Sequence, residues 1–133
     1  MKKKVLIADA GEQFRNELAA ALENNEEFEV IGVAADGQEA LEMALENQPD
    51  IVVLDLLLPQ YDGIHVLDLI FARYGFYKAV VVTGFVSDYI ISALAKRGVS
   101  ALLKKPCSVQ CVIDRIKEEL QRENLFDEGK NEE

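Results

Sequence analysis

The chain has 133 residues, half of them hydrophobic, and a formal net charge of −10 from 14 basic and 24 acidic side chains. This length predicts one domain with its own core, and the composition excludes a disordered chain. The acidic balance opposes nucleic-acid binding by this chain alone, because phosphate contacts need a basic face. No apolar run approaches the roughly 20 residues of a membrane span, and Asp9 stops the first run too early for a signal peptide, so we expect a cytoplasmic protein.

Apolar runs alternate with helical spacings along the whole chain. In order, they predict a strand at 3–9, a helix at 13–24, a strand at 28–35, a helix at 38–47, a strand at 51–55, a helix at 64–74, a strand at 79–83, a helix from 87 or 88 to 96 or 97, a strand at 99–104 and a last helix capped by Ser108. Such alternation implies a parallel sheet with right-handed crossovers. We therefore expect an α/β domain of the flavodoxin-like, doubly wound type, with five strands in the order 2-1-3-4-5 and five helices.

The composition changes toward the end of the chain, where the residues become polar and acidic. We expect the domain to cover residues 1–122, and residues 123–133 to be an acidic tail or the start of a linker. Within the domain, the spacing of the second helix directs Leu45 toward the core. Cys107 and Cys111 are expected to be buried free thiols, because two cysteines and His65 cannot close a zinc site without carboxylates.

Asp55 is the most informative residue, because it follows four apolar residues at 51–54 directly. Such a run is typical of a strand buried on both faces, and the carboxyl end of that strand is where open parallel sheets bind their ligands. A loop aspartate without a function would fit this position equally well. The residues that follow the other predicted strands distinguish between these two interpretations.

Polar groups follow three other predicted strands: Asp9 the first, Thr83 the fourth and Lys105 the fifth. Each has a structural interpretation of its own, as a helix cap, a strand residue or a solvated loop charge, but their joint occurrence at one sheet edge favours a site. Two carboxylates can hold Mg²⁺, and a hydroxyl and an ammonium group can bind phosphate oxygens. The set therefore predicts phosphoryl chemistry at a carboxylate.

With their spacing, these residues resemble the receiver domain of bacterial two-component response regulators, a CheY-like fold. The matching segments are residues 4–9, Asp55 with Pro59 and Gly63, Thr83-Gly84 and Lys105-Pro106, and the resemblance covers residues 3–120. It implies that Asp55 accepts a phosphoryl group from a histidine kinase or phosphotransfer protein, that Thr83 turns toward the acyl phosphate, and that Lys105 pairs with it. It also implies that Mg²⁺ is held by Asp9, Asp55 and the backbone carbonyl of Leu57.

The resemblance also implies the wider role of the domain. Phosphorylation would control transcription through an output domain absent from this chain, so that DNA is contacted only through that domain. A homodimer would form through the face made by the fourth helix, fifth strand and fifth helix, and the chain would not be a dedicated enzyme, although it can release its own phosphoryl group. Residues 29–41 resemble most the master regulator of sporulation in spore-forming bacteria, which suggests a role in sporulation.

Two positions depart from the family pattern. Ala10 stands where a second acid normally follows Asp9, which predicts weakened Mg²⁺ binding unless Glu12 takes its place. Leu102 stands where an aromatic residue normally reports phosphorylation. An alternative is therefore a degenerate receiver that acts as a phosphorylation-independent interaction module. A phosphatase or flavodoxin on this fold is disfavoured, because Leu57 replaces a second aspartate and residues 9–12 are unsuited to phosphate.

Overall fold

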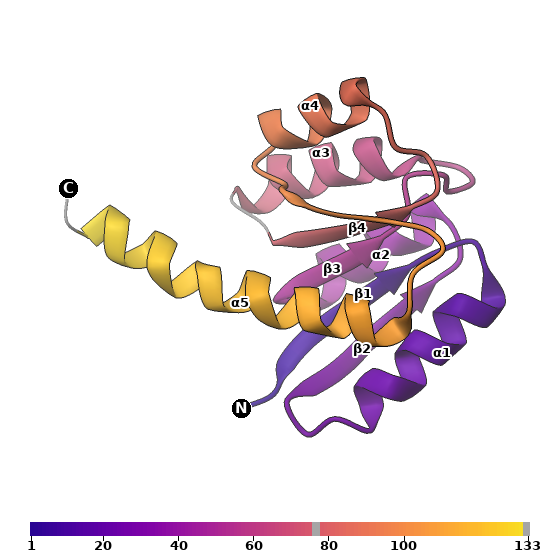
Figure 1. Cartoon of the computed structure of the whole chain (residues 1–133), viewed down its shortest axis with the longest axis horizontal. Helices are drawn as coiled ribbons and strands as arrows, with labels where there is room; N and C mark the ends of the chain where they lie inside the picture. The colour runs from indigo at the N-terminus through magenta and orange to yellow at the C-terminus, as the bar shows by residue number, and fades with distance from the viewer. Residues whose placement is uncertain (76–77, 132–133) are drawn as a thin grey trace.

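The computed structural model describes the backbone of residues 1–75 and 78–131 and the side chains of residues 1–75 and 78–122. Its sheet consists of the parallel strands β1 (Lys3–Ala8), β2 (Phe28–Ala34), β3 (Ile51–Leu54), β4 (Ala79–Thr83) and β5 (Ala101–Lys104) (Figure 1). The helices are α1 (Glu12–Glu23), α2 (Gly37–Asn47), α3 (Gly63–Tyr74), α4 (Asp88–Lys96) and α5 (Val109–Asn131). The strand order is β2-β1-β3-β4-β5, which confirms the predicted fold.

Helices cover both faces of the sheet, and the two faces form separate cores. In β1, Leu6 and Ala8 pack in the core shared with α2, α3 and α4, whereas Val5 and Ile7 pack with α1 and α5. This division follows from the strand itself, because successive side chains point to opposite faces. All four residues of the central strand β3 are buried, as expected for a strand covered on both sides.

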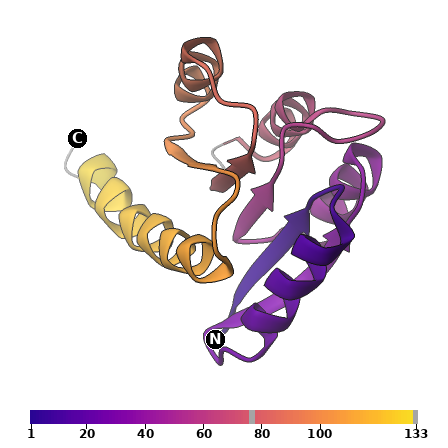
Figure 2. The same ribbon diagram turned by 45° about the vertical axis from the view of Figure 1, so that its right-hand side comes forward.

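The last helix is longer than expected from the sequence. Ser108 caps it by accepting a hydrogen bond from the Cys111 N–H at 3.1 Å, and the helix then continues to Asn131. Residues 117–125 contain good helix formers and no proline, so nothing ends the helix where a tail was expected. Figures 1 and 2 show its last turns projecting away from the sheet. Neither this helix nor any other in the described part of the chain is both long and apolar enough to cross a membrane.

The boundary between a domain at 1–122 and a tail or linker at 123–133 stays a prediction, and residues 132–133 lie outside the described part of the chain. Two side-chain predictions are wrong. Leu45 is 39% exposed, because the core-facing stripe of α2 runs through Ala40 and Ala44 and Leu45 lies about 100° further around the helix. Cys111 is exposed and Cys107 is partly exposed, since the inward face of α5 is occupied by larger apolar residues.

Candidate functional site

Three of the predicted site residues meet directly at the carboxyl edge of the sheet. The Lys105 Nζ donates hydrogen bonds to Asp9 Oδ2 at 2.7 Å and to Asp55 Oδ2 at 2.9 Å. Both aspartates are nearly buried, at 2% and 8% exposed. The fold thus brings together two carboxylates and one ammonium group from three different strand ends.

Backbone hydrogen bonds of the sheet place these side chains. The Asp55 N–H donates to the Ala8 carbonyl at 3.0 Å, and the Asp9 N–H donates to the Ala34 carbonyl at 3.0 Å. Each aspartate is therefore fixed by the strand beside it, at the point where the parallel ladder ends. The Lys105 N–H donates to the Thr83 carbonyl at 2.9 Å, which fixes the lysine next to the fully buried threonine.

The second oxygen of each carboxylate accepts a backbone amide. Asp9 Oδ1 accepts from the Gly11 N–H at 2.8 Å, and Asp55 Oδ1 accepts from the Leu57 N–H at 3.1 Å. Thr83 Oγ1 accepts from the Phe85 N–H at 3.3 Å, so the threonine hydroxyl is engaged with the loop that follows β4. The side chains of Asp9, Asp55 and Thr83 are thus each held by a hydrogen bond from a nearby backbone amide.

The donor set fits a hard divalent ion. Mg²⁺ takes one or two protein carboxylates together with water and phosphate oxygens, and Asp9 and Asp55 converge closely enough to share one ammonium group. Among the described side chains, no group of three His, Cys, Asp or Glu residues is placed to hold a metal. Glu12 therefore does not complete a three-acid site with the two aspartates. The role of the Leu57 carbonyl stays a prediction.

Lys105 carries the main electrostatic feature of the site. Burial alone would lower its pKa, but the hydrogen bonds and negative charges of Asp9 and Asp55 outweigh that effect, so the pKa of the Lys105 ammonium is raised above its ordinary value. Since that ordinary value is already about 10.4, the lysine stays charged at neutral pH. One positive charge consequently balances part of the two negative charges of Asp9 and Asp55.

Two residues of α1 contribute to the site and were not predicted from the sequence. The Phe14 ring lies 4.9 Å from the Lys105 Nζ, within the range of a cation–π contact. The Arg15 Nη1 donates to the carbonyl of Asp9 at 3.0 Å and so holds the β1–α1 connection. Phe14 also packs against the core on the α1 and α5 side of the sheet, and its contact with Lys105 follows from the packing of α1 beside α5.

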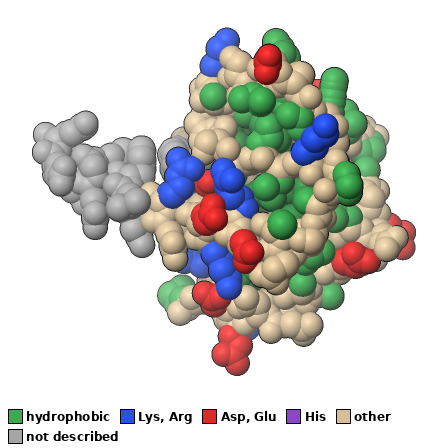
Figure 3. All heavy atoms as spheres, in the orientation of Figure 1, with side chains coloured by type: hydrophobic (Ala, Val, Ile, Leu, Met, Phe, Trp, Pro, Cys, Tyr) green, Lys and Arg blue, Asp and Glu red, His purple; other side chains and the backbone are tan. Residues whose placement is uncertain are grey.

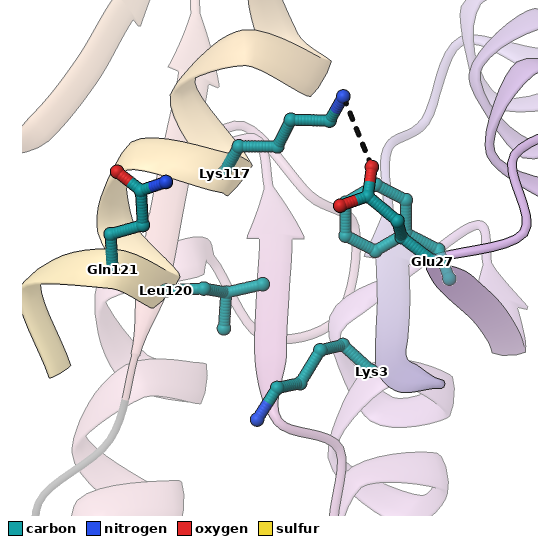
Figure 4. A pocket seen from close by; sticks show the side chains of 6 residues that line it. Lys3, Glu27, Lys117, Leu120 and Gln121 are labelled. Atoms are coloured by element: carbon teal, nitrogen blue, oxygen red, sulfur yellow. Dashed lines mark ion pairs between the residues drawn. The ribbon is translucent and has the colours of Figure 1, made fainter. Parts of the chain in front are cut away.

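Of two hollows in the described surface, one lies far from this site and the other beside it. One, of about 240 Å³, is lined by Lys3, Phe28, Leu120 and Gln121 and is spanned by an ion pair of 3.2 Å between Lys117 Nζ and Glu27 Oε2 (Figure 4). Lys3 and Phe28 begin their strands, so this hollow lies at the opposite edge of the sheet from Asp55. The other, of about 150 Å³, is lined by residues of the loops that follow Asp55 and Thr83.

The comparisons with known proteins agree with this geometry. Residues 5–117 match the family model of the response regulator receiver domain. Transcriptional regulatory protein LiaR of Bacillus subtilis is 33% identical over 114 residues, which are 86% of this chain and 54% of that protein. Response regulator protein VraR of Staphylococcus epidermidis is 29% identical over 127 residues, which are 96% of this chain and 61% of that protein. The chain thus spans about half to three fifths of these relatives.

Solved structures show the same fold. A CheY-like response regulator receiver domain protein from Methanospirillum hungatei has a TM-score of 0.84 and 26% identity, with 95% of this chain and 99% of that chain covered. A chain of the CheX-CheY-BeF3-Mg²⁺ complex from Borrelia burgdorferi has a TM-score of 0.77 and 25% identity, with 87% of each chain covered.

Proposed function

This chain belongs to the response regulator receiver family, and we propose that it accepts a phosphoryl group on Asp55 and thereby controls a transcriptional output carried by a domain outside the chain. The observation that supports this proposal most is that Asp9 and Asp55 both bind the Lys105 ammonium group. The Lys105 Nζ lies 2.7 Å from Asp9 Oδ2 and 2.9 Å from Asp55 Oδ2. A nearly buried carboxylate beside a second carboxylate and a fixed positive charge is the arrangement needed for phosphoryl transfer.

In the proposed transfer, an oxygen of Asp55 forms a bond to the phosphorus while the bond from phosphorus to the donor histidine nitrogen breaks, and that nitrogen keeps the electron pair. Lys105 then pairs with a phosphoryl oxygen in place of the Asp55 carboxylate. The Thr83 hydroxyl turns from the Phe85 N–H to donate to another phosphoryl oxygen. Asp9 and Asp55 would hold Mg²⁺, which supplies positive charge to the phosphoryl oxygens when bound.

The direct test is incubation of the chain with acetyl phosphate and Mg²⁺, followed by intact-mass spectrometry. We expect addition of one phosphoryl group, labile to hydroxylamine as an acyl phosphate is. Absence of any addition, also from a phosphorylated histidine donor, would support the second candidate, a degenerate receiver that acts only through protein contacts. Ala10 and the partly buried Leu102 favour that candidate, because an acid and an aromatic switch are missing.

The partners and setting follow from the same proposal. Receiver domains interact with histidine kinases or phosphotransfer proteins, and the proposed donor is one of these. The proposed location is the cytoplasm, the chain is not a dedicated enzyme, and DNA is contacted only by the output domain. Sporulation is the narrower proposal for that output, supported by the similarity of residues 29–41 to the sporulation regulator.

Mg²⁺ binding is expected to be weak and to improve when the missing acid is restored. Ala10→Asp adds a charged oxygen ligand beside Asp9, so we expect the Mg²⁺ dissociation constant to fall about tenfold or more. Titration of both proteins with Mg²⁺, followed by NMR shifts of the Asp55 and Leu57 amides, measures this. Ala35→Asp, an added acid on the β2–α2 connection, is the charge control and should change the constant little. Equal affinities of wild type and Ala10→Asp would contradict the expectation.

Self-association is expected to be weak in the resting state. The dimer face proposed for α4, β5 and α5 carries five charged residues, namely Lys96, Arg97, Asp114, Lys117 and Glu118. Two of them are engaged elsewhere, since Arg97 binds Asp68 at 2.7 Å and Lys117 binds Glu27 at 3.2 Å. Figure 3 shows acidic and basic side chains interspersed over α5 and apolar side chains gathered over α4.

Exposed charge pairs contribute only about 0.2 to 1 kcal/mol each, so we expect a chain that is mainly monomeric or weakly dimeric. Sedimentation velocity should show association that increases with beryllofluoride and Mg²⁺, with a smaller increase in Thr83→Ala. A tight dimer whose dissociation constant changes neither with beryllofluoride nor in Thr83→Ala would contradict a phosphorylation-dependent contact. It would favour the degenerate receiver.

A further inference from the structure

The hollow at the amino edge of the sheet, which we call the Lys3–Leu120 pocket, combines an apolar floor with charged walls. Its lining residues are Lys3, Glu27, Phe28, Lys117, Leu120 and Gln121. Phe28 is part of the core on the α1 and α5 side of the sheet, and Leu120 packs against that core. A cavity of about 150 Å³ already holds a benzene molecule, so the volume of about 240 Å³ has room for one ring with a short polar extension.

Backbone hydrogen bonds hold the strand side of the pocket in place. Lys3 and Phe28 are paired in the parallel ladder of β1 and β2, and the Lys3 N–H donates to the Glu27 carbonyl at 2.9 Å. The Glu27 N–H donates to Asn25 Oδ1 at 2.9 Å, which orders the turn before β2. On the other side, Leu120 is fixed by the packing of α5 against the core. The pocket is therefore preformed, as small-molecule sites usually are.

Two ammonium groups flank the apolar floor, and they differ in their partners. The Lys117 Nζ lies 3.2 Å from Glu27 Oε2, whereas no described side chain pairs with the Lys3 ammonium group. In Figure 4 the ion pair lies on one side of Leu120 and the Lys3 side chain on the other. Among the described residues, one positive charge of the pocket is thus left without a counter-charge, although the chain has a net charge of −10.

These features fit a compact anion with an apolar body. A carboxylate can pair with the Lys3 ammonium group while a ring or branched chain covers Leu120 and the edge of Phe28. A second copy of the chain is a poor occupant, because its net charge of −10 repels it as a whole. A docking helix of a partner is about 10 Å across, which is too wide for a hollow of this volume.

We propose that the Lys3–Leu120 pocket binds a small monocarboxylate whose apolar body is about the size of one ring. The carboxylate pairs with the Lys3 ammonium group, and the body lies on Leu120 and Phe28. Glu27 limits the affinity, because its negative charge repels the ligand and its carboxylate occupies the ammonium group of Lys117. The pocket lies at the opposite edge of the sheet from the acceptor aspartate, so the proposal does not depend on phosphoryl transfer.

Titrations of the full chain with three probes, followed by NMR shifts of the backbone amides, test the ligand chemistry. Phenylacetate should shift the amides of Glu27, Phe28, Leu120 and Gln121 in a saturable manner. Phenylacetamide lacks the charge and acetate lacks the apolar body, so each should bind about fivefold or more weakly. Equal binding of phenylacetamide would overturn the assigned charge, and equal binding of acetate would overturn the assigned apolar body. Absence of saturable shifts at these amides up to about 10 mM phenylacetate would overturn the site.

Lys3→Gln tests the residue that pairs with the carboxylate. It should weaken phenylacetate binding about threefold or more, because an ion pair at a partly exposed site is worth up to about 1 kcal/mol. Lys2→Gln is the matched control, since Lys2 is the neighbouring exposed lysine and lies outside the lining. It should change the affinity less than about 1.5-fold, because an exposed charge outside the pocket is screened. Equal losses in both variants would show general attraction to the basic start of the chain and overturn the pocket assignment.

Glu27→Gln tests the opposite direction. It removes the repelling charge and leaves Lys117 available to the ligand, so phenylacetate should bind about twofold or more tightly. Glu26→Gln, a neighbouring exposed glutamate outside the lining, should leave the affinity unchanged. Equal gains in both variants, or weaker binding in Glu27→Gln, would overturn the role given to Glu27. Asp55→Asn should bind phenylacetate as the wild type does, so the pocket and the proposed phosphoryl transfer can fail independently.

Discussion

Asp55→Asn is expected to eliminate phosphoryl incorporation from acetyl phosphate. The carboxylate is the nucleophile in the proposed transfer, and the amide that replaces it has neither the charge nor the free oxygen to form the acyl phosphate. The substitution keeps the shape of a residue that is only 8% exposed, so the fold should survive. Intact-mass spectrometry after incubation with the donor measures the result, and circular dichroism confirms that the variant is folded.

Asp50→Asn is the matched control for this variant. Asp50 directly precedes β3, at the other end of the same strand, and is exposed, with its carboxylate accepting the Lys4 N–H at 2.7 Å. Phosphoryl incorporation should be unchanged in Asp50→Asn. Incorporation that survives in Asp55→Asn, or that is lost equally in both variants, would mean that another group accepts the phosphoryl or that the loss has a structural cause.

Gly37→Ala is expected to destabilise the domain strongly. A Cβ at this position would lie 1.8 Å from the backbone oxygen of Tyr61, and the Gly37 N–H also donates to the Pro59 carbonyl at 2.9 Å. The loop between β3 and α3, which follows Asp55, therefore rests directly on the first residue of α2. Because backbone atoms cannot yield as a flexible side chain does, we expect the free energy of unfolding to fall by about 3 kcal/mol or more.

Urea denaturation measures this effect, and Gly84→Ala provides the control. No atom lies within 4 Å of a Cβ built at Gly84, so alanine there should change the free energy of unfolding by less than about 1 kcal/mol. A Gly37→Ala protein as stable as Gly84→Ala would show that the loop moves freely away from α2. The close contact between loop and helix would then have no part in positioning Asp55.

The strands and the main site residues could be predicted because their signals are local. β3 is a continuous apolar run, which is what burial on both faces demands, and the residue after it had to lie at the carboxyl edge. Asp9, Asp55 and Lys105 each follow a strand directly, so the parallel sheet brings them together whatever the connecting helices do. The ion pairs of Lys105 with both aspartates confirm that expectation.

The features that could not be predicted depend on contacts between elements. Phe14 has the spacing of a core residue, and its place beside the Lys105 ammonium follows only from how α1 packs. Leu45 shows the opposite error, since helical spacing placed it on the inner face, whereas small alanines define the buried stripe of α2. The hydrogen bond from Phe85 to Thr83 arises in a loop whose backbone path no residue pattern specifies.

The most direct test of the account is to locate the phosphoryl group itself. Borohydride reduces an aspartyl phosphate to homoserine, and peptide sequencing by mass spectrometry then identifies the modified position. The account predicts homoserine at position 55 in the phosphorylated wild type and at no other aspartate, with none in a sample that received no phosphoryl donor. Homoserine at another position, such as 9 or 62, or its absence from a chain that carries a phosphoryl group, would contradict Asp55 as the acceptor.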